Sequence, residues 1–447
     1  MSQNDDKQHN DKNNHLRNDI SLHLRTRARF VYNADTMPDI IQDLQAVSNV
    51  GMGEACTAYA LDGCVPQVVV EPASAEEVCA VLKVCCTHRA PGVVWGGGTH
   101  VPIGSPMEQY LWAMDMRALS RLRDYSPGDL VVTVEAGMTL EALQNLLQPY
   151  QQWLPIDAPL PAVQTVGGIV ASGGAGPRRH RYGLAREWLL AVRAVLPSGE
   201  MIKAGVGVVK NVAGYDLPRL FAGSWGTLGV LVELTFKVAP LPEVAVVVRS
   251  SFTEVRTLFH LYDALSHPLL QAEMVEVVYS ADSGWHLYVG LAGFEEDVRW
   301  QTNLLQERVP TEWTPVASEE VNWLRDRYLL ANPICGCRLV VPPAQTPEIL
   351  VWAHERFPQA SLQAHFSTGI VRVWWTENVP DGQALRELRA QARARGGFGV
   401  LERAPVAVKQ EIDVWDSVSG GASVMRRLKE RFDPHRILAP GRFVEGL

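Results

Sequence analysis

The chain has 447 residues, of which 47% are hydrophobic and 20% are charged, and its formal net charge is −8. This length exceeds what one hydrophobic core supports and predicts two or three lobes. The acidic balance argues against a protein that wraps nucleic acid, and no run approaches the ~18 apolar residues of a membrane span.

The N-terminal residues 1–27 are polar and contain no hydrophobic segment of signal-peptide type. So little apolar surface cannot offset the entropy of ordering, and we expect a disordered tail there. Residues 28–64 are expected to pack on the first lobe. The seven cysteines lack the spacings typical of zinc or iron–sulfur ligands. We therefore expect a cytoplasmic protein with reduced thiols and no metal site or electron relay of its own.

A strand, a helix and a second strand are predicted between Pro66 and Trp95. The run 66–72 is apolar, Ser74 to Glu77 is a capping-box pattern, and 92–95 is a strand that leads directly into three glycines. A Rossmann fingerprint instead follows the first strand and opens a helix. The pattern therefore argues against an NAD-type fold.

Further glycine clusters lie between 163 and 231, separated by short apolar runs. Backbone that must pass close to a flat, phosphorylated ligand needs this composition, because glycine adds no side chain and tolerates unusual dihedral angles. Before them we expect a strand at 130–134 and a helix capped by Thr139. Together the two glycine regions predict a buried dinucleotide.

The sequence pattern changes at about Val244, where glycines become rare and predicted strands alternate with predicted helices. The repeated β-α-β-β-α order predicts two ferredoxin-like units side by side, although a single irregular α+β lobe remains open. The terminal segment 424–443 is expected to dock back on the first lobe. The expected elements of the second lobe are strand 244–250, helix 253–266, strands 274–279 and 285–291, helix 294–307, strand 338–342, helix 346–356, strands 361–366 and 370–375, helix 382–395 and strand 398–402.

Two strings, KNVAGYDLPRL at 210–220 and GSWGTLGV at 223–230, resemble the FAD-binding subunit of glycolate oxidase (glycolate dehydrogenase). The string AGPRR at 175–179 points to the same subunit. More broadly, 65–241 looks like the FAD-binding domain of the vanillyl-alcohol oxidase and p-cresol methylhydroxylase superfamily. The terminal FDP and PGR motifs match the closing motif of that superfamily.

The resemblance implies an α+β fold: a two-subdomain FAD-binding domain at 65–242, a ferredoxin-like cap at 243–410, and a segment, 411–447, that returns to the first domain. It also implies FAD as the cofactor. The implied cofactor-binding residues are Trp95, Gly96, Gly97, Gly98, Thr99, His100, Gly104, Thr165, Val166, Gly167, Gly168, Ser172, Gly173, Gly176, Gly226, Gly229 and Val230.

Three departures from the family pattern matter. Many relatives have an arginine where Trp95 stands. Relatives with covalent flavin have a histidine at the position of Thr99, whereas His100 lies one residue later, so we expect non-covalent FAD. Catalytic hydroxy-acid relatives carry an HxxGDGNxH-like motif in the cap, and the corresponding AHFSTGI at 364–370 has one histidine and no acid.

Oxidation of a 2-hydroxy acid needs a cation for the carboxylate and a base for the hydroxyl proton. Each candidate could instead have a structural role. For the basic run 178–181, the alternative is a contact with a partner subunit or with the FAD phosphates. The candidate catalytic residues are Arg178, Arg179, Lys210, Tyr215, His365 and Arg372.

The leading hypothesis is an FAD-containing subunit of a dehydrogenase for glycolate or a related 2-hydroxy acid. A second flavoprotein and an iron–sulfur chain would be its partners, with membrane association only through them. The alternatives are a stand-alone flavin oxidase or dehydrogenase and a flavin-binding structural subunit that turns over nothing alone.

Overall fold

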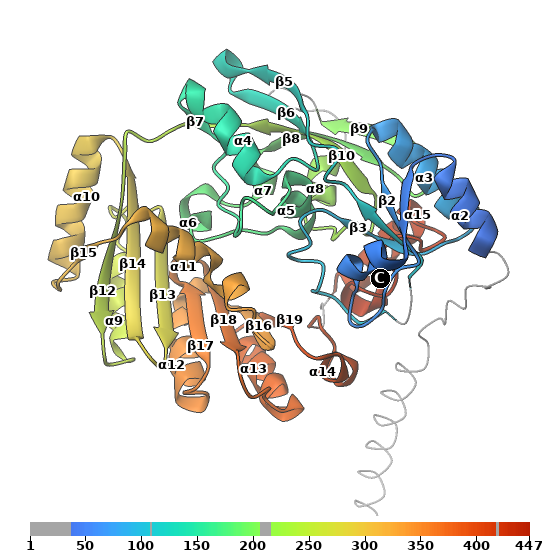
Figure 1. Ribbon diagram of the computed structural model, residues 1–447. Coiled ribbons are helices and arrows are strands. Elements are labelled where there is room, and N and C mark those ends of the chain that lie inside the picture. Colours follow the sequence, from blue (N-terminus) through green and yellow to red (C-terminus); the bar gives the residue numbers. More distant parts are fainter. Residues whose placement is uncertain (1–36, 108–109, 206–215, 417–419) are drawn as a thin grey trace, which may run out of the picture.

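The computed structural model describes residues 37–107, 110–205, 216–416 and 420–447 (Figure 1). The first lobe begins with a small mixed sheet in which β2, β4 and β3 run parallel and β1 is antiparallel to β2. Two helices, α2 (Met37–Gln45) and α3 (Ala75–Thr87), pack their apolar faces on it. The strand order is β1 (Asn49–Met52), β2 (Val68–Glu71), β4 (Trp112–Asp115) and β3 (Gly92–Trp95), with the 3₁₀ helix η2 (Gly53–Tyr59) after β1.

The same lobe contains a second, antiparallel sheet with its own apolar core. The predicted caps are confirmed: Ser74 Oγ accepts from the Glu77 amide at 3.1 Å, and Thr139 Oγ1 accepts from the Ala142 amide at 3.2 Å. The strand order is β5 (Leu122–Ser126), β6 (Val131–Glu135), β10 (Val230–Lys237), β8 (Leu189–Val195) and β9 (Met201–Gly205). Its other elements are η3 (Pro127–Asp129), α4 (Leu140–Leu147), η4 (Gln148–Tyr150), β7 (Gln152–Trp153), α5 (Val166–Ser172), α6 (Arg179–Tyr182), α7 (Ala185–Trp188), α8 (Leu217–Phe221) and β11 (Ala239–Pro240).

The second lobe is built on one continuous sheet of eight strands. In each half the fourth strand lies beside the first, and the halves join edge to edge where β13 pairs with β17, for example Val277 opposite Ala364. Two ferredoxin-like units side by side are therefore confirmed. The strand order is β15 (Thr314–Pro315), β12 (Val244–Phe252), β14 (Gly284–Gly293), β13 (Met274–Ser280), β17 (Ser361–His365), β18 (Ile370–Trp375), β16 (Cys335–Val340) and β19 (Phe398–Arg403). The helices are α9 (Thr257–Leu265), α10 (Glu295–Arg308), α12 (Thr346–Arg356) and α13 (Gly382–Ala394), with η5 (Pro343–Gln345) and η6 (Phe366–Thr368).

Several elements were not expected from the sequence, and β4 and α11 show why. Strand β4 has only four residues, yet it lies between β2 and β3, so the predicted strands of the β-α-β unit do not pair with each other. Helix α11 (Ser318–Leu330) has no clear apolar stripe, because it buries Asp326 and Arg327 together with Leu324 and Tyr328. Binary patterning cannot identify a helix that buries charged residues.

The C-terminal segment returns to the first lobe, as predicted. Figure 1 shows α15 (Ala422–Phe432) next to the N-terminal elements, and the Gly92 amide donates to the Ile437 carbonyl while the Ala439 amide donates to the Gly92 carbonyl, both at 2.8 Å. Lys429 of α15 is buried and donates to Asp433 at 2.6 Å. The segment also holds η7 (Val444–Gly446), and α14 (Val406–Glu411) connects the cap sheet to it.

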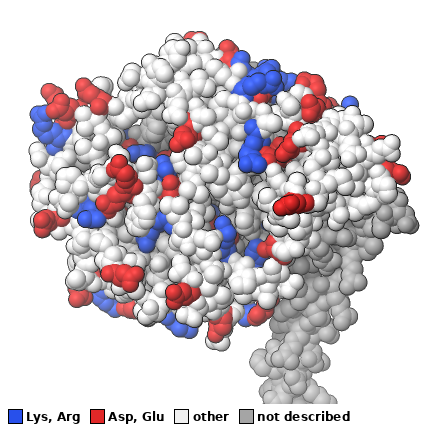
Figure 2. Space-filling model, in the orientation of Figure 1, with Lys and Arg blue, Asp and Glu red and all other residues white. Residues whose placement is uncertain are grey.

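Acidic and basic side chains are interspersed over the face shown in Figure 2. Among the helices of the described residues, none combines the length and apolarity needed to cross a bilayer.

Candidate functional site

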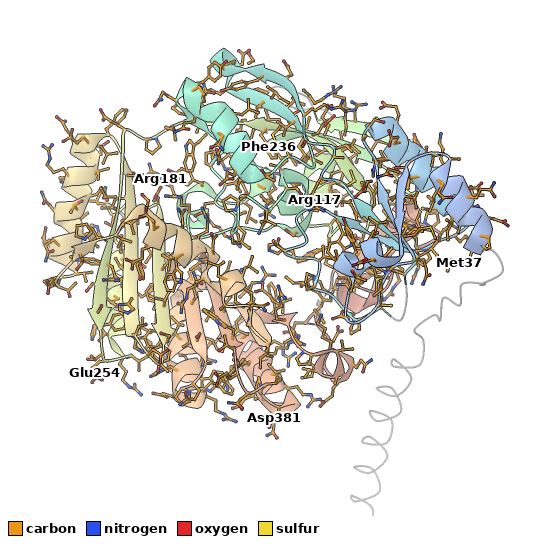
Figure 3. The ribbon with its side chains drawn as sticks, in the orientation of Figure 1. Met37, Arg117, Arg181, Phe236, Glu254 and Asp381 are labelled. Atoms are coloured by element: carbon orange, nitrogen blue, oxygen red, sulfur yellow. The ribbon has the colours of Figure 1, made fainter. Side chains whose placement is uncertain are left out.

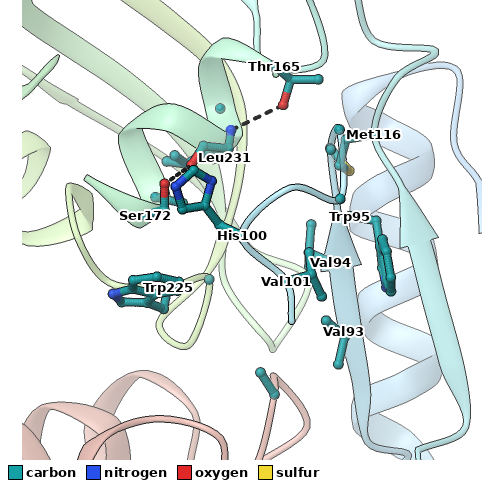
Figure 4. A pocket seen from close by; sticks show the side chains of 18 of the residues that line it. Val93, Val94, Trp95, His100, Val101, Met116, Thr165, Ser172, Trp225 and Leu231 are labelled. Atoms are coloured by element: carbon teal, nitrogen blue, oxygen red, sulfur yellow. Dashed lines mark hydrogen bonds between the residues drawn. The ribbon is translucent and has the colours of Figure 1, made fainter. Parts of the chain in front are cut away.

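A cavity that is partly open to solvent lies between β3, α5 and the C-terminal segment (Figure 4). The three glycines after β3 form one wall, and the residues around α5 form the opposite wall. The cavity therefore joins the two glycine regions that the sequence singled out.

The glycine loop leaves a row of backbone amides without partners. The amides of Gly97, Gly98, Thr99 and His100 donate no hydrogen bond to other described residues. Gly98 has φ +73°, which favours glycine, and a Cβ at Gly97 would overlap the Val163 carbonyl oxygen. Successive free amides form a nest suited to a phosphate group.

The opposite wall approaches the loop closely. Thr165 caps α5 by accepting from the Gly168 amide at 3.2 Å, as Figure 4 shows. A Cβ at Gly96 would overlap Thr165 Oγ1, and one at Gly167 would lie 2.7 Å from the Ala136 carbonyl oxygen. No other residue type fits either glycine position without moving the walls apart.

The cavity also contains unsatisfied polar side chains. Trp95 Nε1 and Gln164 Nε2 are buried and have no hydrogen-bond partner among the described residues, and both residues line the cavity. Buried donors without partners are costly unless a ligand or water satisfies them. Glycine walls, free amides and orphaned donors together fit an extended dinucleotide.

Most of the predicted cofactor residues line this cavity, and Gly104, Val166, Gly173 and Gly176 do not. Val166 is buried in α5, Gly173 ends that helix at φ +68°, and Gly104 packs on the Arg442 side chain. The predicted residues that line the cavity are Trp95, Gly96, Gly97, Gly98, Thr99, His100, Thr165, Gly167, Gly168, Ser172, Gly226, Gly229 and Val230.

Sequence reasoning missed several lining residues. Trp225 and Thr227 lie inside the glycine-rich block and were available to it, whereas Trp415, Arg442 and Phe443 come from the C-terminal segment. In the sequence analysis the terminal PGR motif served only to support the resemblance to the superfamily. No local pattern indicates that its arginine reaches the cavity.

A second, smaller cavity adjoins the first, since His100 and Ile103 line both. It lies between the first lobe and the cap sheet. Gly176, one of the predicted cofactor residues, lines this second cavity instead of the first. The other lining residues are Pro159, Ala175, Arg325, Tyr328, Leu329, His365, Arg372, Glu402 and Arg403.

His365 and Arg372, both predicted catalytic residues, meet in this second cavity. His365 Nδ1 lies 2.6 Å from Glu276 Oε1, and its Nε2 lies 3.2 Å from Arg372 Nη1. Since a guanidinium can only donate, Nε2 accepts and Nδ1 carries the proton, which it donates to Glu276. Arg372 Nε in turn donates to Glu402 at 3.0 Å. The imidazole is thereby fixed in one tautomer.

Several donors in the second cavity have no partner in the described part of the chain. Arg372 Nη2 and the Arg403 guanidinium make no hydrogen bond there, and the Tyr328 hydroxyl is buried without one. Burial raises the pKa of Tyr328 well above its usual value, so the phenol stays protonated. The two guanidinium groups offer charged donors to a small anion, whereas the Tyr328 hydroxyl packs against Gly336.

His100 stands at the junction of the two cavities. Burial lowers the pKa of His100 to about 4, so the ring is neutral at pH 7. Its Nδ1 lies 3.0 Å from Thr99 Oγ1.

The basic residues after Gly176 contact the cap domain and do not line either cavity. Arg178 Nε donates to Glu273 at 3.0 Å, and Arg181, labelled in Figure 3, donates to the Ala292 carbonyl at 2.8 Å. The Arg179 guanidinium makes no hydrogen bond or ion pair with described residues, and burial together with the positive Arg338, Arg186 and Arg372 lowers its pKa.

Asp157 lies beside this run. Its Oδ2 is 4.0 Å from Arg178 Nη1 and its buried Oδ1 has no partner within the described ranges. Burial raises the pKa of Asp157 to about 7.

The catalytic roles predicted for Arg178 and Arg179 stay predictions, and so do those of Lys210 and Tyr215, which lie outside the described residues. No group of three or more His, Cys, Asp or Glu side chains that could hold a metal ion occurs in the part of the chain that the structure describes.

Residues 66–205 match the sequence model of the FAD binding domain family. The match indicates that these residues bind FAD. The predicted cofactor is therefore confirmed, and the match covers the glycine loop and α5 but neither the cap nor the C-terminal segment.

Curated relatives agree with an FAD-dependent oxidoreductase. The chain is 33% identical over 214 residues to the mitochondrial D-lactate dehydrogenase [cytochrome] of Arabidopsis thaliana, covering 48% of this chain and 37% of the relative. It is 37% identical over 164 residues to glycolate oxidase subunit GlcE of Escherichia coli, covering 36% and 46%. The D-2-hydroxyglutarate dehydrogenase of Xanthomonas citri pv. viticola is 25% identical over 422 residues, covering 85% and 89%. The first two matches thus span less than half of each relative.

Solved structures confirm the fold class. p-Cresol methylhydroxylase has a TM-score of 0.71 at 16% identity, covering 93% of this chain and 98% of its own. The 4-ethylphenol oxidase of Gulosibacter chungangensis has a TM-score of 0.72 at 13% identity, covering 92% and 98%. The two-subdomain lobe with a ferredoxin-like cap is therefore shared with these proteins.

Proposed function

We propose that the chain is the FAD-binding flavoprotein subunit of a 2-hydroxy-acid dehydrogenase of the glycolate type. Relatives named for D-lactate, D-2-hydroxyglutarate and glycolate support a small hydroxy acid as substrate. The observation that carries the proposal is the second cavity, where free arginine donors and His365 adjoin the FAD cavity through His100 and Ile103.

The FAD placement follows from the glycine geometry. The free amides of 97–100 would hold the diphosphate against Gly167 and Gly168, while Ser172 would lie nearer the ribityl chain and 226–230 beside the adenine. We expect the flavin to be held without a covalent bond. When bound, FAD supplies a two-electron acceptor for the hydride that leaves the substrate carbon.

The residues of the second cavity would bind and deprotonate the acid. Arg403 and Arg372 Nη2 would bind the substrate carboxylate, because a guanidinium fork matches its two oxygens. In the absence of substrate, Arg372 Nη1 donates to His365 Nε2. If the substrate carboxylate accepts this donor instead, His365 Nε2 becomes free to accept the hydroxyl proton. Glu276 would then stabilise the imidazolium. The product is then the corresponding 2-oxo acid.

The electrons would leave through other chains. A second flavoprotein subunit and an iron–sulfur subunit are the proposed partners, supported by the subunit names of two relatives, GlcD and GlcE. The predicted cytoplasmic location stays a prediction, since some relatives are named mitochondrial.

The test uses FAD-loaded full-length protein with glycolate, D-lactate or D-2-hydroxyglutarate and a dye acceptor, first alone and then with co-purifying partner chains. Flavin bleaching by one of these acids, with dye turnover that increases with partners, is the expected result. Full dye turnover by the isolated chain would instead favour a stand-alone enzyme. Absence of bleaching in every condition would favour a structural flavin subunit and contradict the proposal.

A further inference from the structure

Two buried cations meet one carboxylate behind the glycine loop. Lys409 Nζ donates to Asp62 Oδ1 at 2.7 Å, and Arg442 Nη1 lies 3.6 Å from Asp62 Oδ2. The three side chains are between 3% and 9% exposed. They come from the segment before β2, from α14 and from the C-terminal segment, so this Asp62–Lys409–Arg442 cluster joins three distant parts of the chain.

The cluster binds the carbonyl oxygens of the segment that follows the loop. Lys409 donates to the Pro102 carbonyl at 2.8 Å. Arg442 donates to the carbonyls of Val101 at 2.6 Å and Ser105 at 3.2 Å. The Ser105 amide returns a hydrogen bond of 3.0 Å to the Arg442 carbonyl. The backbone immediately after His100 is therefore fixed almost entirely by these two side chains.

The cluster also carries a positive charge that its own carboxylate does not balance. Two cations face one anion, and burial is the main cause that lowers the pKa of both Lys409 and Arg442. Arg442 lines the same cavity as the free amides of 97–100. The loop itself supplies no cation, because 95–101 reads WGGGTHV and His100 is neutral at pH 7.

We propose that Asp62, Lys409 and Arg442 are positioning residues for the diphosphate of FAD, holding the glycine loop in its binding shape and supplying the buried positive charge that it lacks. The proposal rests on the FAD placement given above. It also explains the return of the C-terminal segment, since that segment brings Arg442 to the cavity.

The test measures the dissociation constant of FAD for the refolded or flavin-stripped full chain, by quenching of flavin fluorescence. The variants are Arg442→Met, Lys409→Met and the charge-conserving Arg442→Lys. The control is Arg249→Met, which removes a cap ion pair with Glu320 of 2.7 Å that lines neither cavity. Thermal unfolding of each apo protein is measured in parallel, so that loss of fold is separated from loss of binding.

Arg442→Met and Lys409→Met are expected to weaken FAD binding by roughly 10- to 100-fold, the range found when a group that orients a binding shell is removed. Arg442→Lys should recover part of that loss, and the control should bind FAD normally even where its melting temperature falls. FAD affinity within about threefold of wild type in Arg442→Met and Lys409→Met would overturn the inference, as would an equal loss in the control. Failure of the wild-type chain to bind FAD would instead contradict the proposed function.

Discussion

Arg178 Nε donates a 3.0 Å hydrogen bond to Glu273 Oε1, and this pair joins the FAD-binding lobe to the residue that precedes strand β13 of the cap sheet. Glu273 is buried, with a side chain only 2% exposed. An arginine that the sequence suggests for catalysis thus has a partner that explains its presence structurally.

We expect Arg178→Met to lower the free energy of unfolding by about 2 kcal/mol, because it leaves a buried carboxylate without its cation. FAD affinity should change little. Chemical denaturation and flavin titration check both expectations. Loss of turnover at unchanged stability would show that Arg178 is catalytic instead.

Asp157→Asn tests the carboxyl whose pKa is raised to about 7. Because the folded-state pKa exceeds the unfolded value of 3.8, the folded protein binds more protons, and stability falls as pH rises from about 4 to about 7. The amide variant avoids this loss while it can still accept from the Arg178 amide. Its melting temperature should exceed that of wild type at pH 8 and match it at pH 4. A difference that does not vary with pH would contradict this account.

Arg372→Met and Arg403→Met address substrate binding. Each removes a guanidinium that faces the second cavity, so KM for the hydroxy acid should increase by roughly 10- to 100-fold, as for a lost charged hydrogen bond. Arg372→Met should also lower kcat, since Arg372 contacts His365. Arg356→Met, which removes a surface pair with Glu387, is the matched control on the cap. Unchanged KM in both cavity variants would exclude this cavity as the substrate site.

Lys429→Met tests how the C-terminal segment is stabilised. Lys429 donates to Asp433, to the Thr227 carbonyl at 2.9 Å and to the Leu438 carbonyl at 2.8 Å. Its loss leaves Asp433 fully buried without a cation, and we expect a cost of about 3 kcal/mol in unfolding free energy. Arg426→Met, which removes a partly exposed pair with Glu445, should cost less than about 1 kcal/mol. Equal costs would contradict the buried-pair argument.

Gly97→Val should abolish FAD binding, because its Cβ would overlap the Val163 carbonyl oxygen and separate the two walls. Gly128→Val is the control, since a Cβ there meets no atom within 4 Å. Flavin content after purification, read from the absorbance spectrum, measures the effect. Normal flavin content in Gly97→Val would show that the loop does not form the diphosphate site.

Local sequence patterns predicted helices and strands well where the hydrophobic period and the residues at the ends of the element indicate the same boundaries. The helix at 346–356 and the strand at 370–375 match α12 and β18 to the residue, because each has clear boundaries. Strand β4 was missed because, unlike the equally short β2 and β3, it has no proline or glycine next to it, and α11 because it buries charged side chains.

The parts of the cavity that are rich in glycine could be predicted from the sequence. Loop 96–98 and the start of α5 follow from composition alone, since only close backbone approach explains so many glycines. Arg442 and Trp415 were missed because their approach to the cavity depends on the path of the chain end, which no local pattern encodes. The contacts of Arg178 with the cap were hidden for the same reason.

The most direct measurement is a crystal structure of the protein with FAD bound. The diphosphate oxygens should lie within about 3.2 Å of backbone amides among residues 97–100, with the flavin ring reaching the junction at His100. A diphosphate bound elsewhere, with those amides still unpaired, would contradict the account.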